Sequence, residues 1–226
     1  MDKYSIVLNR ISISSHITIK DFFTELIKRE YDRESVWGFS NVNLIDSLVS
    51  AILLKKVTAY YRVWNDKTGE MERQSYNMIK EVKFCVDFKK SYFMVEGGVS
   101  NMNIVKQSFR NMFWNSFIYS SIDKTPYDYL LLFQKDKLLV DIDELTINDF
   151  RFKEIFLGRY IARLTMPILD IEFLSNYKSS ISKSKMILKY MDENIIFTVS
   201  KTNNLTIACS ENVKFSFLEY LMSKLY

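Results

Sequence analysis

Hydrophobic and polar residues alternate most regularly near the middle of the chain. Alternation with a period of two runs over 57–64 and again over 82–88, which predicts two strands with one buried face each. The segment 65–70 between them contains Asn, Asp and Gly, the residues of a hairpin turn. A third strand is expected over 92–96, ending at two consecutive glycines. Together these segments predict an antiparallel β-meander.

Other segments carry apolar residues at helical spacing. This pattern predicts helices over 19–31, 44–52, 102–117, 171–191 and 210–225. Thr18, with Asp21 three residues later, resembles a helix-capping pair. Further strands are expected over 4–13, 138–142, 150–156, 195–200 and 205–209. The pattern leaves 127–133 undefined and fits either a strand or a helix over 158–165.

The order of these elements predicts an α+β fold of antiparallel β-meander and hairpins, with helices packed on one face. Strand, turn, strand and helix occur in that order near 82–117 and again near 195–225. Two ββα-type subdomains are therefore one interpretation, with residues 1–122 and 123–226 as the N- and C-terminal parts. A single domain is the alternative, and whether the two ββα units arose by duplication stays open.

Composition places the chain among globular proteins. Its 17 Phe and 14 Tyr residues exclude intrinsic disorder. No signal peptide and no apolar run long enough for a transmembrane helix are recognised, so the expected location is the cytoplasm, without membrane contact. Cys85 and Cys209 are expected to be buried thiols without a disulfide. The bias towards Lys, Ile, Asn, Tyr and Phe suggests an AT-rich genome, of a low-GC bacterium or its phage.

Catalytic and cofactor signatures are missing from the sequence. Neither glycine-rich phosphate loop is present, and no Gly-x-Ser-x-Gly elbow occurs. His16 is the only histidine, which leaves too few ligands for a Cys/His zinc site. No cofactor is predicted.

Two acidic pairs could still serve an enzyme. Asp141 and Asp143 would share one side of a strand, and Asp170 and Glu172 have the same spacing. Two carboxylates on one face can hold Mg²⁺ while substrate phosphates complete its shell. These residues define the alternative hypothesis of a metal-dependent nuclease or phosphodiesterase; the competing interpretation is a solvated strand end or a helix N-terminus, where carboxylates suit the helix dipole.

A second candidate site combines basic and aromatic residues. Exposed aromatic side chains beside Lys or Arg on a sheet can stack and neutralise single-stranded nucleic acid. The candidate residues are Tyr60, Arg62, Trp64, Lys83, Lys89, Lys106 and Arg110. Packing of the aromatic rings against lysine stems is the competing interpretation.

The leading hypothesis is a non-enzymatic binding or accessory protein. Its first expected partner is a protein or a second copy of the chain, because binding needs no catalytic constellation and Met and aromatic residues suit interfaces. Nucleic acid is the second expected ligand. The net charge of +4 is too small to require a polyanionic partner.

Overall fold

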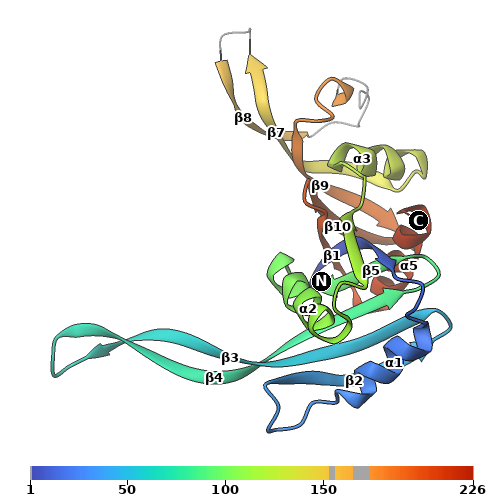
Figure 1. Ribbon diagram of the computed structural model, residues 1–226. Coiled ribbons are helices and arrows are strands. Elements are labelled where there is room, and N and C mark those ends of the chain that lie inside the picture. Colours follow the sequence, from blue (N-terminus) through green and yellow to red (C-terminus); the bar gives the residue numbers. More distant parts are fainter. Residues whose placement is uncertain (1, 153–155, 165–173, 226) are drawn as a thin grey trace. The chain divides into compact units, whose positions relative to one another are not determined.

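The computed structural model describes residues 2–152, 156–164 and 174–225 (Figure 1). The strands pair antiparallel and helices accompany them, so the predicted antiparallel α+β class is confirmed. Backbone contacts divide the chain into two compact units, which are described separately below. The first unit, called the arm unit after the long β-hairpin that it contains, comprises Ser12–Val95 and Asn103–Ile118. The second, called the C-terminal unit because most of it follows residue 118, comprises Met1–Ile11, Glu96–Met102 and Tyr119–Tyr226. The subdomain division predicted near residue 122 stays a prediction.

The arm unit is built on a four-stranded meander in the order β2-β3-β4-β5. Its elements are α1 (Ile19–Lys28), β2 (Trp37–Ile45), β3 (Leu48–Asn65), β4 (Glu70–Asp87), β5 (Tyr92–Glu96) and most of α2 (Val99–Phe113). Helix α1 begins at the predicted pair, because the Thr18 side chain accepts from the Asp21 backbone and the Asp21 carboxylate accepts from the Thr18 backbone.

Aromatic packing forms the core of this unit. Phe109 of α2 is fully buried, and its ring lies 5.2 Å from Phe22 of α1 and 5.3 Å from Phe84 of β4. Both helices therefore cover the same side of the meander. Burying rings of this size is the largest contribution of single side chains to such a core.

The strands of the C-terminal unit pair in the order β1-β11-β10-β9-β7-β8. Its elements are β1 (Asp2–Ile13), β6 (Phe117–Ser121), α3 (Pro126–Lys135), β7 (Leu139–Phe152), β8 (Phe156–Leu164), β9 (Ile181–Tyr190), β10 (Glu193–Ser200), β11 (Asn204–Cys209) and α5 (Glu211–Leu225). Phe133 of α3 and Phe217 of α5 pack on Phe197 of β10, with ring centroids 5.1 and 6.0 Å away. Helices α3 and α5 thus share one buried cluster.

Four helix predictions were wrong in whole or in part, the first because α1 ends at Lys28 instead of residue 31. Residues 44–52 form the end of β2, a tight turn and the start of β3, and 181–190 form strand β9. The third predicted helix ends at Phe113 instead of 117, because Trp114 has a φ of 53° and the chain then enters β6. The undefined segment 127–133 is helical, within α3.

Most of the remaining predicted elements are present, but 150–156 is not one strand: 150–152 end β7, 156 begins β8, and 153–155 lie outside the described residues. Strands occur at 2–13, 139–152, 193–200 and 204–209, and the segment that fitted either a strand or a helix is strand β8. Both hairpin–helix units, β4-β5-α2 and β10-β11-α5, exist as elements, while their common origin stays a prediction. Cys85 and Cys209 are buried free thiols. Among the described residues, no helix is both long and apolar enough to cross a membrane.

Candidate functional site

The hairpin of β3 and β4 is much longer than the sheet that holds it. The two strands pair continuously from Leu48 opposite Asp87 to Asn65 opposite Glu70. Strand β2 pairs with β3 only as far as Lys55, and β5 pairs with β4 only from Phe84 onward. Residues 57–78 are therefore a two-stranded ribbon, called the arm here, which extends past α1 and β2 in Figure 1.

Alternation along the two strands gives the arm two different faces. One, called the basic face, carries Thr58, Tyr60, Arg62, Trp64, Met71, Arg73, Ser75 and Asn77. The other, called the apolar face, carries Val57, Ala59, Tyr61, Val63, Glu72, Gln74, Tyr76 and Met78. The apolar face continues the side on which Leu53 and Val82 are buried against the helices.

The basic face concentrates positive charge beside exposed aromatic rings. Arg62 lies directly opposite Arg73 in the register, and this face of the arm has no carboxylate. The Arg73 guanidinium lies 3.8 Å from the centroid of the Tyr60 ring. Tyr60 and Trp64 are 59% and 56% exposed, so both rings can be reached from solvent. The arrangement offers two cations and two exposed aromatic rings on one side of a ribbon, with one face of the Tyr60 ring covered by Arg73.

The structure brings together only part of the predicted basic-aromatic set. Lys83 is exposed and lies on the same side of β4 as Arg73, nearer the body of the unit. Lys89 lies in the turn after β4, where its backbone N–H donates to the Asp87 carboxylate. Lys106 and Arg110 lie on α2, which packs against the opposite side of the sheet. Partial burial lowers the pKa of Lys106.

Arg73 is a candidate that the sequence analysis missed. In the sequence, residues 71–81 show no regular alternation of apolar and polar residues. The structure gives the reason, because every side chain from Glu70 to Ile79 is exposed and none of them has to be apolar. The turn at 65–70 could have identified Arg73. If Asn65 pairs with Glu70, then three residues further from the turn on each strand Arg62 pairs with Arg73. Hairpin register follows from the turn once the turn is located.

The acidic candidates are placed differently from the predicted pair. A β-bulge lies between Ile142 and Glu144, so Asp141 and Asp143 do not follow a regular alternation. Asp143 accepts a hydrogen bond from Lys185 at 2.5 Å, and that bond, with the lysine charge, lowers the pKa of Asp143. Asp170 and Glu172 lie outside the described residues. Within the described part of the chain, no group of three His, Cys, Asp or Glu side chains could hold a metal ion.

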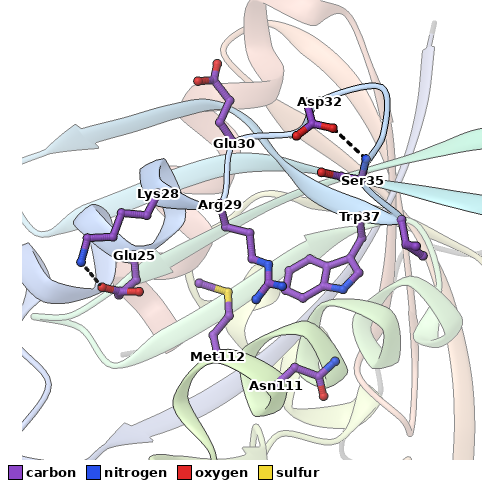
Figure 2. A pocket seen from close by; sticks show the side chains of 10 residues that line it. Glu25, Lys28, Arg29, Glu30, Asp32, Ser35, Trp37, Asn111 and Met112 are labelled. Atoms are coloured by element: carbon purple, nitrogen blue, oxygen red, sulfur yellow. Dashed lines mark hydrogen bonds and ion pairs between the residues drawn. The ribbon is translucent and has the colours of Figure 1, made fainter.

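A polar hollow of about 660 Å³ lies between α1, the loop before β2, and α2 (Figure 2). The Arg29 guanidinium lies over the Trp37 ring, 4.1 Å from its centroid. Lys28 pairs with Glu25 at 2.6 Å, and the Asp32 carboxylate accepts from the Ser35 backbone. These side chains are thus engaged with neighbours within the hollow.

His16 lies at the start of the loop before α1, between two serine hydroxyls. Its Nδ1 is 2.7 Å from Ser14 Oγ and its Nε2 is 3.2 Å from Ser116 Oγ. A catalytic triad needs a carboxylate on one ring nitrogen and a nucleophile on the other. Both nitrogens face hydroxyls here, so the geometry ties the loop to the segment after α2 and is not that of a triad.

Comparison with known proteins adds no functional assignment. No protein-family model matches the chain, and no curated protein matches it either.

Proposed function

We propose that the protein is a non-enzymatic binding protein that takes up single-stranded nucleic acid on the basic face of its arm. One observation carries the proposal: Arg62 and Arg73 lie opposite each other on a face without carboxylates, next to exposed Tyr60 and Trp64. The sequence favoured a protein partner first, and this pairing of charges is the reason to place nucleic acid ahead of it.

Like charges directly opposite each other on a sheet destabilise the pair. No carboxylate of the same face offsets the charges of Arg62 and Arg73. A phosphate group held between two guanidinium groups would remove the repulsion and accept hydrogen bonds from both. The free chain therefore carries an unfavourable charge pair that a polyanion would turn into a favourable site.

The aromatic rings favour unpaired bases over a duplex. Tyr60 and Trp64 lie on the same strand, two residues to either side of Arg62. A base stacked on an exposed ring contributes about 1–3 kcal/mol, and stacking requires that the base be free of its own partners. Duplex DNA offers only its backbone and groove edges to such a face, so single strands should bind more tightly.

The test measures binding of a fluorescent oligonucleotide of mixed sequence by anisotropy over a range of salt concentrations. The variant Arg62→Glu with Arg73→Glu removes both proposed phosphate contacts. We expect at least a tenfold loss of affinity near 0.1 M salt, and a salt slope smaller by about 1.4 if two contacts are lost from a single strand.

The matched control is Lys55→Glu with Lys80→Glu. It changes the formal charge by the same amount, and the two lysines lie at the base of the apolar face. Equal losses of affinity in both variants would mean that only net charge matters. An unchanged affinity and slope in the arginine variant would overturn the proposal.

A further inference from the structure

The apolar face of the arm is a sheet surface with no cover among the described residues. It continues the core-facing side of β3 and β4 beyond the helices, with Tyr61, Tyr76 and Met78 exposed by 44%, 51% and 41%. The Tyr61 and Tyr76 rings contact each other edge to face, 5.7 Å apart. Apolar residues that continue the buried side of a sheet into solvent are typical of a binding surface.

Charge divides this face into two oppositely charged ends. Lys55 lies opposite Lys80 at the base, and Glu70 and Glu72 lie two residues apart at the tip. Among the described residues none of these four groups forms an ion pair, although Glu72 accepts a hydrogen bond from the Asn65 side chain. Each end therefore holds two neighbouring like charges that form no ion pair among the described residues.

We infer that the apolar face binds the same face of a second copy of the chain, with the two arms antiparallel. In that arrangement the lysines at the base of one arm meet the glutamates at the tip of the other, twice in one symmetric interface. The twofold axis passes near the middle of the ribbon, between the pairs Ala59–Tyr76 and Tyr61–Gln74. An interface of this isologous kind requires a self-complementary surface, which the face provides.

The head-to-head alternative would set lysine against lysine and glutamate against glutamate. Charge thus selects the antiparallel arrangement, while the apolar middle supplies burial. At about 3.4 Å per residue the face is roughly 34 Å long, and two strands about 4.8 Å apart make it roughly 10 Å wide, so two such faces would bury on the order of 700 Å². That area is below the roughly 1,000 Å² of a stable specific interface, so we expect a weak dimer with a dissociation constant of about 0.1 mM.

This inference does not depend on the proposed nucleic-acid site. The two faces lie on opposite sides of the ribbon, so a dimer through the apolar face leaves both basic faces outward. Dimer formation can therefore fail while nucleic-acid binding persists, and the reverse also holds. Different variants report on each.

Sedimentation-velocity ultracentrifugation over a concentration series tests the dimer. Wild-type protein should shift from monomer to dimer as its concentration rises. Lys55→Glu with Lys80→Glu should weaken association at least tenfold, because attraction at both ends becomes repulsion. Glu70→Lys with Glu72→Lys should do the same. Arg62→Glu with Arg73→Glu is the charge-matched control on the other face and should dimerise as the wild type does.

The chain that carries all four substitutions makes the test specific for the antiparallel arrangement, because bases set against bases and tips against tips would meet only like charges. An equimolar mixture of the lysine and glutamate variants should form a heterodimer, since each base then meets a tip of opposite sign. A chain carrying all four substitutions should dimerise with itself. The inference would be overturned by a wild type that stays monomeric at about 1 mM in low salt. It would also be overturned if neither the mixture of variants nor the chain with four substitutions formed a dimer, and this face would then bind a different partner.

Discussion

Gly38 offers a sharp test of how the arm unit holds the loop that follows α1. It is buried in β2, where the backbone of residues 29–31 passes directly over it. A Cβ atom at this position would lie 2.6 Å from Tyr31 Cα, 2.8 Å from Tyr31 N and 2.9 Å from Arg29 O. These neighbours are backbone atoms, so no side-chain rotation can relieve the overlap.

The cost of Gly38→Ala follows from what must move. Displacing the loop would break the bonds from Tyr31 N to Phe39 O (2.8 Å) and from Phe39 N to Arg29 O (2.9 Å). Each contributes about 1 kcal/mol net, and overpacking adds about 1–3 kcal/mol. Alanine also reduces the conformational entropy of the unfolded chain, which stabilises the folded protein by about 0.4–1 kcal/mol. We therefore expect the free energy of unfolding to fall by about 2–5 kcal/mol.

Urea denaturation followed by far-UV circular dichroism measures this change. Gly158→Ala in β8 is the matched control, because its Cβ would meet nothing within 4 Å. That control should change stability by less than about 1 kcal/mol, in the stabilising direction. A Gly38→Ala protein within about 0.5 kcal/mol of the wild type would refute the close approach of the loop to β2.

Two further substitutions test the cores and their pH dependence. Phe109→Ala removes a fully buried ring at the centre of the aromatic cluster. Urea denaturation should show a fall in the unfolding free energy of about 3–5 kcal/mol. Phe215→Ala, at an exposed position, should change the unfolding free energy by less than about 0.5 kcal/mol. Asp136 accepts hydrogen bonds from Lys224 and Tyr220, which lower its pKa below the ordinary 3.8. Its stabilisation is therefore present above that value and is lost as pH falls through the lower folded pKa. Asp136→Asn should be less stable than the wild type near pH 6, and the difference should shrink towards about pH 2; a constant difference would contradict this.

Local patterns predicted the strands of the meander but not every helix. Residues 57–64 and 82–88 alternate strictly, and both lie in the β3–β4 hairpin as expected. Leu44, Ile45, Leu48 and Val49 imitate a helical stripe because a two-residue turn separates Ile45 from Leu48, to which it pairs. A pattern that spans a tight turn combines two strands into one apparent period.

Strand β9 shows how a polar core residue conceals a strand. Ser184, Met186 and Leu188 are buried in strict alternation. Lys183 and Lys185 alternate with them and pair with Glu144 and Asp143. A serine at a core position removed the first apolar residue of that period, so the sequence favoured a helix.

The candidate sites depended on pairings that one strand cannot reveal. Arg62 was predicted from its own strand, whereas its partner Arg73 is set by the register of the whole hairpin. The bulge beside Asp143 likewise depends on the pairing of β7 with β9. Long-range register therefore limits what the sequence could show at both sites.

Contact between Trp64 and an unpaired base is the most direct measure of the proposed function. The chain has three tryptophans, so Trp37→Phe with Trp114→Phe leaves Trp64 as the only one. We predict that single-stranded oligonucleotide quenches its emission saturably, with the dissociation constant found by anisotropy, and that duplex of the same sequence quenches it far less. Binding by anisotropy without any change in Trp64 emission would contradict the account and place the nucleic acid elsewhere on the protein.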